Sequence, residues 1–281
     1  VTDFFEPLPT EIQALPDDHA AQPLDADSVL ATIEASTEQI PNYEVRPQQI
    51  SMAQAIISAF NNKTHLIVEA GTGTGKSLAY LLPAVQWALQ NNRRVVVSTN
   101  TINLQDQIFN KDIPLVRKLV EQPFSAAVMK GRANYLCPRR LAAVRRRQPD
   151  TLDEARTFAK ILIWLQETQT GDRSEISLRG SEFFTWNRMS AQDEDCTTHR
   201  CASQMAGTCP YHKAQIQAEA SQIVIANHAL LISDAQTDNH VLPDYRHLIV
   251  DEAHQLEDAI TRGVGQRLDQ IDVIRHLNNI G

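Results

Sequence analysis

One glycine-rich segment constrains the fold of this chain more than any other feature. Its sequence is Glu69-Ala70-Gly71-Thr72-Gly73-Thr74-Gly75-Lys76-Ser77, preceded by an apolar run at residues 66–68 and followed by an amphipathic helical pattern. Glycines let the backbone curl so that successive N–H groups face phosphate oxygens, while the following helix presents the positive end of its dipole. The segment therefore predicts a phosphate-binding loop at residues 70–77, between a strand and a helix.

The last two residues of this loop carry the expected chemistry. Lys76 is expected to reach the β and γ phosphates of a nucleotide, and the Ser77 hydroxyl is expected to ligate Mg²⁺. ATP and Mg²⁺ are therefore the expected cofactors. Taken alone, the segment also fits an ordinary strand-to-helix turn that is rich in glycine and threonine.

Composition sets the outer limits of the prediction. With 281 residues, 42% of them hydrophobic, the chain can bury a full core and form about two domains. It contains no apolar run of about 18 residues, the minimum for a membrane span. Residues 1–6 lack the basic and apolar regions of a secretory signal. We therefore expect a cytoplasmic protein with no membrane partner.

The charge of the chain is unevenly distributed. Residues 1–45 hold ten of the 34 acidic residues and no Lys or Arg, so 24 acidic and 26 basic residues remain in the rest of the chain. The window at residues 130–147 carries seven basic residues and no carboxylate. Such a stripe is typical of a surface that contacts nucleic-acid phosphates, although a solvated helix face would look the same.

The order of the patterns predicts an α/β fold. Uninterrupted apolar strands alternate with amphipathic helices, which favours a parallel sheet covered by helices on both faces. We expect strands at residues 66–69, 94–98, 126–129, 221–226 and 247–251. We expect an acidic, proline-rich arm at 1–41 with one short helix capped by Ser28, a nucleotide-binding domain at 42–130 and 214–260, an insertion at 131–213, and the start of a truncated helical insertion at 261–281.

A second motif completes the predicted nucleotide site. Asp251-Glu252-Ala253-His254 follows an apolar strand, so its carboxylates would meet the phosphate loop at the carboxyl edge of the sheet. We assign Asp251 to the metal and Glu252 to the base that deprotonates the attacking water, and Lys76 completes the catalytic set. His254 is interpreted as a coupling residue.

These motifs resemble those of superfamily-two helicases, one branch of which has Asp-Glu-Ala-His as its second nucleotide motif. Tyr43-Glu44-Val45-Arg46-Pro47-Gln48-Gln49 looks like the adenine-reading motif of that branch. The resemblance implies that Gln49 contacts the base, with Arg46 beside it, because a Gln amide both donates and accepts hydrogen bonds. Ser98-Thr99-Asn100-Thr101 looks like the motif that holds the backbone of a nucleic-acid strand.

All four cysteines lie in the predicted insertion, at Cys137, Cys196, Cys201 and Cys209. In a cytosolic chain this clustering indicates a metal rather than disulfides. The Cys-x2-Cys pairs typical of structural zinc are missing, and proline follows Cys137 and Cys209, so four thiolates around a [4Fe–4S] cluster fit better. On spacing alone, zinc and unliganded thiols remain alternatives.

Two further phrases make the resemblance more specific. Lys130-Gly131-Arg132-Ala133-Asn134-Tyr135-Leu136-Cys137 and Ala226-Asn227-His228-Ala229-Leu230-Leu231 are similar to segments of the iron–sulfur helicases of the DinG and XPD type, most closely the bacterial DinG group. The resemblance implies a RecA-like motor domain with a small, mostly helical cluster insertion that touches single-stranded DNA. It also implies 5′ to 3′ unwinding of duplexes, R-loop junctions or other DNA/RNA structures in repair.

The resemblance and the charge pattern together give the expected DNA contacts, which are Thr99, Asn100, Arg132, Tyr135, Arg139 and Arg140. Aromatic residues of the insertion are further candidates for stacking on bases, namely Trp164, Phe183, Phe184 and Trp186. For Trp164 a place in a helix core is the preferred interpretation.

The sequence also predicts what this chain does by itself. It ends 27 residues after His254, before any second motor domain could supply an arginine to the transferring phosphoryl group. We therefore expect a fragment that binds ATP weakly and does not unwind DNA. The arm resembles the joint after the 3′–5′ exonuclease domain of some bacterial relatives. Two other functions remain open, a zinc-stabilised ATPase that remodels RNA or protein and a redox-sensing DNA-binding protein.

Overall fold

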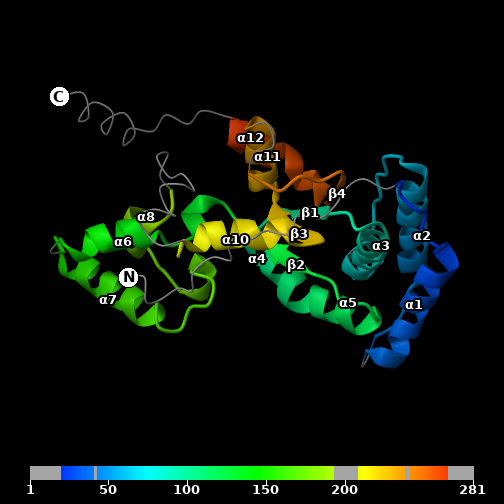
Figure 1. Cartoon of the computed structure of the whole chain (residues 1–281), viewed down its shortest axis with the longest axis horizontal. Helices are drawn as coiled ribbons and strands as arrows, with labels where there is room; N and C mark the ends of the chain where they lie inside the picture. Colours follow the sequence, from blue (N-terminus) through cyan, green and yellow to red (C-terminus); the bar gives the residue numbers. More distant parts are fainter. Residues whose placement is uncertain are drawn as a thin grey trace.

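A four-stranded parallel sheet forms the centre of the computed structural model (Figure 1), which describes residues 20–40, 43–71, 73–147, 149–192, 208–237 and 241–264. Its strands are β1 (Val95–Thr99), β2 (Ala126–Val128), β3 (Ile223–Asn227) and β4 (His247–Val250). They lie in the order β2-β3-β1-β4, and all three pairings are parallel. This confirms the predicted α/β class. Within the described ranges, no helix has the length and apolar character needed to cross a membrane.

Alternating strand residues build two cores, one on each face of the sheet, because successive side chains in a strand point to opposite faces. Val95, Val97 and Ile225 join the first core, whereas Val96 and Val224 join the second. The first core is covered by α1 (Ala26–Gln39), α2 (Pro47–Asn62), α3 (Lys76–Asn91) and α5 (Ile113–Leu119), and the second by α10 (Pro210–Glu219) and α11 (His228–Gln236). The expected helices on both faces are therefore present.

Helix α1 belongs to the first core. The side chain of Asp25 caps α1 by accepting a hydrogen bond from the Asp27 amide at 3.1 Å, so the helix begins before the predicted cap, Ser28. Val29 and Ile33 lie one helical turn apart and are both buried against the first core. The described part of the predicted arm therefore packs on the nucleotide-binding domain and is not a separate linker.

The predicted strand at residues 66–69 is the one strand that does not form. Residues 64–70 are described without strand pairing, and the side chains of Leu66, Ile67 and Val68 are 42%, 98% and 38% exposed. The outer edge of β4 has no partner strand among the described residues. A short apolar run becomes a strand only through tertiary pairing, which this segment lacks. The prediction was wrong at this position, although the loop that follows keeps its expected place before α3.

The helical region after β1 is not one regular helix. It consists of α4 (Ile102–Gln107), a π-helical turn (Ile108–Asp112) and α5. A π turn inserts an extra residue per turn and changes which side chains share a face, and such turns are frequent at functional sites. Here the last residue of the π turn, Asp112, lies near the phosphate loop.

The described parts of the connection between β2 and β3 carry several helices, three of which contribute to a third core. These are α6 (Pro138–Arg145), α7 (Leu152–Trp164) and α8 (Glu182–Met189), which lie away from α1, α2 and α3 at the other end of the molecule (Figure 1). Trp164 and Trp186 pack edge to face, with ring centroids 5.7 Å apart. Trp164 is buried in this core, as preferred from the sequence, and Trp186 is fully buried as well, so neither ring is available for stacking on a base.

Candidate nucleotide and DNA site

The phosphate loop has the curled backbone that its glycines predict. Gly73 and Gly75 both have φ of +77°, a conformation that L side chains rarely adopt. Gly75 is the N-cap of α3, so the amides of the first helical turn point toward the loop. The Thr74 hydroxyl donates a 3.0 Å hydrogen bond to the Gly71 carbonyl oxygen. Thr72 lies outside the described residues.

The predicted adenine motif supports this loop directly. Gln49 Nε2 donates to the Gly75 carbonyl oxygen at 3.1 Å and also to the Tyr43 hydroxyl. The Arg46 guanidinium donates to the Gly73 carbonyl oxygen. Gln49 is only 1% exposed, so a base could reach its amide only after these hydrogen bonds are exchanged. The contact of Gln49 with adenine remains a prediction. The sequence pattern did not predict that Gln49 and Arg46 hold the phosphate loop.

The second motif lies at the edge of the sheet next to this loop. The Asp251 amide donates to the Ser98 carbonyl oxygen at 2.8 Å, which extends the pairing of β1 with β4 by one residue. Glu252 has φ of +55°, and its amide donates to Asp251 Oδ1 at 3.0 Å. A non-glycine residue in this region is strained, and such strain is concentrated at functional sites.

The structure brings the two predicted motifs together. Glu252 Oε1 lies 3.6 Å from Lys76 Nζ, and Glu252 Oε2 lies 3.5 Å from His254 Nε2. The side chains of Lys76 and Glu252 are 29% and 33% exposed, so both remain accessible from solvent. The expected lysine and base therefore share one site.

Two further side chains complete the polar wall of the site. The Tyr80 hydroxyl donates to Asp251 Oδ2 at 3.1 Å, and burial, reinforced by Asp251, raises the pKa of Tyr80 well above its ordinary value. The Ser77 hydroxyl lies near the side chains of Tyr80 and Asp112. Burial raises the pKa of Asp112, and its Oδ2 atom is buried without a hydrogen-bond partner. Sequence reasoning missed both residues, although Tyr80 stands three positions after Ser77 on the same helix face.

These groups fit a magnesium ion that is shared with a nucleotide. Ser77, Asp112 and Asp251 present hydroxyl and carboxylate oxygens, and one of these oxygens, Asp112 Oδ2, has no protein partner. Mg²⁺ prefers oxygen ligands and usually takes only one or two from the protein, with water and phosphate supplying the rest. Within the described ranges, no three His, Cys, Asp or Glu side chains form a group that could hold a metal ion by itself.

Half of the predicted cysteine set is described. Cys137 is the N-cap of α6 and Cys209 is the N-cap of α10, each with proline at the next position. Both are 1% exposed and belong to the second core. Cys196 and Cys201 lie outside the described residues.

Two of the predicted DNA contacts are buried. Thr99 is fully buried at the end of β1, where it pairs with Asn227 of β3. Tyr135 is 3% exposed, since its ring packs edge to face on Tyr211 and its hydroxyl accepts a hydrogen bond from the Lys130 amide. Their side chains are therefore not surface contacts in this structure, contrary to the prediction. Asn100 is partly exposed.

Of the basic residues in the predicted stripe at 130–147, the lysine is buried and only arginines remain at the surface. Lys130 is 2% exposed and is held by carboxylates, so it does not belong to the surface. Arg132 is exposed and its guanidinium lies 5.0 Å from the centre of the Tyr211 ring. Arg140 donates to the carbonyl oxygens of three residues, Arg188, Ser190 and Gln192, and is partly exposed, as is Arg139.

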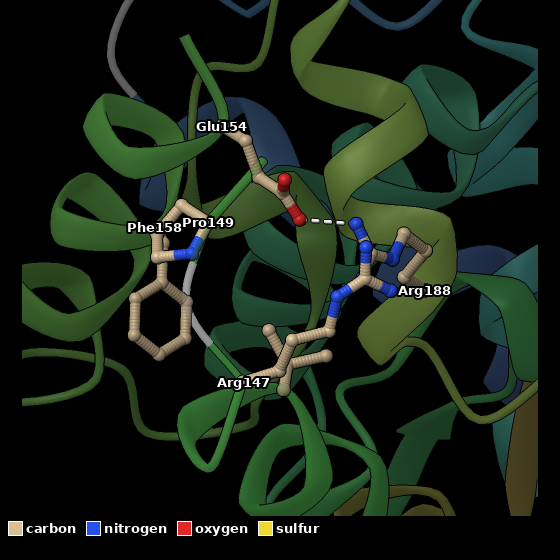
Figure 2. A pocket seen from close by; sticks show the side chains of 6 residues that line it. Arg147, Pro149, Glu154, Phe158 and Arg188 are labelled. Carbon is tan, nitrogen blue, oxygen red and sulfur yellow. Dashed lines mark hydrogen bonds and ion pairs between the residues drawn. The ribbon is translucent and has the colours of Figure 1, made fainter. Parts of the chain in front are cut away.

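The aromatic pair of α8 and a nearby cavity complete this region. Phe183 and Phe184 are 38% and 74% exposed, so these two of the four further aromatic candidates remain accessible. The cavity, shown in Figure 2, is lined by Val144, Arg147, Pro149, Glu154, Phe158 and Arg188. Glu154 and Arg188 form an ion pair across it, and Arg147 pairs with Asp150. Because these charges satisfy one another, we assign no ligand to the cavity.

Comparison with known proteins agrees with this geometry. Residues 46–144 match the DEAD/DEAH box helicase family, and residues 185–273 match the DEAD_2 family. The chain is 36% identical over 247 residues to the 3'-5' exonuclease DinG of Bacillus subtilis, covering 88% of this chain and 26% of that protein. It is 37% identical over 236 residues to the ATP-dependent helicase DinG of Mycobacterium tuberculosis, covering 77% of this chain and 35% of that protein.

A third relative, the ATP-dependent DNA helicase YoaA of Haemophilus influenzae, is 33% identical over 239 residues, which cover 83% of this chain and 36% of that protein. The chain thus spans about a quarter to a third of the length of these relatives. The two family matches include the phosphate loop and the Asp251–His254 motif, the same segments that meet in the structure. The chain therefore carries one segment that matches the DEAD/DEAH box helicases and one that matches the DEAD_2 family, and it is similar to part of the DinG-type proteins.

Proposed function

We propose that this chain forms the ATP-binding part of a DinG-type DNA helicase, which hydrolyses ATP to move along single-stranded DNA. The observation that carries the proposal is the 3.6 Å approach of Lys76 Nζ to Glu252 Oε1, because it joins the phosphate loop and the second motif in one site. The names of the relatives, ATP-dependent helicase DinG and ATP-dependent DNA helicase YoaA, support the same activity. Unwinding with 5′ to 3′ polarity in DNA repair is proposed for the whole polypeptide.

In this proposal the loop amides of residues 70–77 and the side chain of Lys76 bind the phosphates. Mg²⁺, held by Ser77 and Asp251, would neutralise charge on the phosphates. Gln49 and Arg46 would lie next to the base. When Lys76 turns to the phosphates it releases its contact with Glu252, which leaves that carboxylate free to orient and deprotonate a water molecule.

We further propose that Cys137, Cys196, Cys201 and Cys209 bind a [4Fe–4S] cluster. The support is that both described cysteines are buried N-cap residues that belong to one core. A buried cluster there would link α6 to α10 and so tie the connection to the second face of the sheet. Zinc is the alternative metal for the same ligands.

Single-stranded DNA is the proposed partner, at duplex or R-loop junctions. Asn100 follows β1 at the carboxyl edge of the sheet, and Arg132 and Arg139 lie in the connection with exposed or partly exposed side chains. These groups suit the sugar-phosphate backbone and do not read bases. Phe184, with a largely exposed ring, is the best-placed aromatic for stacking.

The test is ATP hydrolysis by the natural polypeptide that contains residues 1–281, measured with and without single-stranded DNA. We expect DNA to stimulate hydrolysis, Lys76→Ala to abolish nucleotide binding, and Glu252→Gln to retain binding but lose hydrolysis. Glu257→Gln, an exposed carboxylate on α12 (Leu256–Val264), is the matched control and should behave like the wild type.

Two results would contradict the proposal. Turnover that survives Lys76→Ala would refute the assigned site. Stimulation by RNA or by a protein, but not by DNA, would favour the remodelling ATPase.

A further inference from the structure

A buried histidine lies between the proposed DNA-contact segment and the hydrolytic turn. His228 is the first residue of α11, directly after β3, and its side chain is fully buried. Residue 227 pairs with residue 99 of β1, and β1 pairs with β4. The ends of all three strands therefore meet around this ring, at the edge of the sheet that carries the nucleotide site.

One ring nitrogen contacts the end of β1. His228 Nδ1 and Ser98 Oγ are 2.8 Å apart, and both side chains are fully buried. The backbone of Ser98 is engaged at the same time, because its carbonyl oxygen accepts the 2.8 Å hydrogen bond from the Asp251 amide. Ser98 thus contacts His228 through its side chain and the hydrolytic turn through its backbone.

The other ring nitrogen lies on the side of the hydrolytic turn. His228 Nε2 is buried and makes no hydrogen bond of normal geometry. Burial lowers the pKa of His228, and the nearby backbone of Glu252 and Asp251 opposes this shift. In a neutral ring whose Nδ1 accepts from the Ser98 hydroxyl, the proton is on Nε2. That proton lies near the backbone of the turn, where Glu252 holds its strained φ of +55°.

We infer that His228 is a positioning residue that couples the segment at 98–101 to the hydrolytic turn. Its Nδ1 accepts from the Ser98 hydroxyl, and its Nε2–H lies near the backbone of Asp251 and Glu252, where a small shift of the turn would bring a hydrogen-bond acceptor within reach and set the orientation that hydrolysis requires. This inference rests on the proposed function.

The coupling has a direct physical basis. The backbone segment that begins at Ser98 continues through Asn100 to Thr101, whose hydroxyl caps α4. A DNA strand bound there would displace β1 relative to β4, and the ring would transmit that displacement to Glu252. The Nε2–H has no hydrogen-bond partner in the structure described, and a small shift of the turn would supply one.

The experiment compares Ser98→Ala, His228→Asn and the double variant in the natural polypeptide that contains this chain. Ser98→Ala removes only the hydroxyl and leaves the backbone hydrogen bond to Asp251 in place. We expect each single variant to lower kcat for DNA-stimulated ATP hydrolysis about tenfold, with the Kd for Mg·ATP within about threefold of the wild-type value. The double variant should be no slower than the slower single variant, because the two residues act through one link.

The conservative variant His228→Gln places an amide near the position of Nε2 and should recover part of kcat.

Three results would overturn the inference: an unchanged kcat in Ser98→Ala, additive losses in the double variant, or a parallel loss of nucleotide affinity and unfolding temperature, which a mere packing role would give. A wild-type protein without DNA-stimulated hydrolysis would overturn the proposed function as well. If DNA stimulates hydrolysis by the wild type and Ser98→Ala has the same kcat, the inference is overturned and the proposed function stands.

Discussion

The ammonium group of Lys130 lies 2.7 Å from Asp172 Oδ2, and this ion pair fastens the connection between β2 and β3 to the nucleotide-binding domain. The same nitrogen lies 2.8 Å from Asp106 Oδ1 on α4 and 3.0 Å from the Ser174 hydroxyl. The Lys130 side chain is 2% exposed, so its charge is compensated inside the protein. One buried lysine thereby joins the helix that follows β1 to the segment that carries the cysteines.

Lys130→Met should strongly destabilise the protein. Removing one partner of a buried ion pair typically costs about 3–5 kcal/mol, because it leaves the other charge buried without compensation, and the Asp172 side chain is only 10% exposed. Urea unfolding of the chain measures the loss. Lys118→Met, which removes an exposed lysine on α5, is the control and should change the free energy of unfolding by less than about 0.5 kcal/mol.

A second variant tests the cause. Adding Asp172→Asn to Lys130→Met removes the uncompensated carboxylate while keeping Oδ1, which accepts from the Ser174 amide. Part of the stability should return. An equal or larger loss in the double variant would show that the ion pair is not the source of the effect.

Gly75→Ala should disrupt the phosphate loop, whereas Gly71→Ala should be tolerated. A Cβ at Gly75 would lie 2.6 Å from Gln49 Nε2, at a φ of +77° that costs an L residue roughly 1–2 kcal/mol. A Cβ at Gly71 would meet nothing within 4 Å. The affinity for Mg·ATP, measured with a fluorescent analogue, should fall about 5- to 30-fold in Gly75→Ala only. Equal affinities of the two variants would contradict the observed loop conformation.

The strand pattern was predictable because it depends on local hydrophobicity and on period-two burial. Val95, Val96 and Val97 are apolar without interruption, which indicates a strand covered on both faces, and the structure confirms it. The run at residues 66–69 shows the same pattern, yet it does not pair. Whether an apolar run finds a neighbouring strand is decided by tertiary structure, so the pattern alone could not separate the two cases.

The candidate site was predictable only where its residues belong to contiguous motifs. Lys76 and Glu252 were found because each lies in such a motif. Tyr80 lies on a helix face, Asp112 in a π turn and His228 directly after a strand. No spacing rule in the sequence predicts that these residues join the site. Burial could not be derived from residue type either, which is why Lys130, Thr99 and Tyr135 were assigned to the surface and are found inside.

Alkaline conditions should destabilise the protein through its buried tyrosines. Burial raises the pKa values of Tyr80 and Tyr135, so the folded state keeps both hydroxyls protonated when the unfolded chain ionises near its ordinary value of 10.0. The stability that these groups contribute is therefore present below pH 10 and lost as the pH rises above it. The slope approaches about 1.4 kcal/mol per pH unit for each tyrosine.

Tyr135→Phe is the variant that tests this slope. Between pH 10 and 11.5, the free energy of unfolding of this variant should fall less steeply with pH than that of the wild type. The difference between the two slopes should equal the slope that one tyrosine contributes. The other groups that titrate in this pH range contribute equally to both slopes, so the difference between the slopes reports Tyr135 alone. Parallel slopes would show that the Tyr135 hydroxyl ionises equally in the folded and unfolded states.

Cys209→Ser should remove the proposed cluster. Oxygen in place of the thiolate is a poor ligand for iron in such clusters, and Cys209 is a buried N-cap residue whose neighbours leave little room for a substitute ligand. Anaerobically purified wild-type protein should contain iron and sulfide and absorb visible light, and the variant should lose all three signals. Thr208→Ser, one residue earlier, removes a buried methyl group but no thiol and should keep them. A colourless wild-type protein that contains zinc would replace the cluster with a zinc site on the same cysteines.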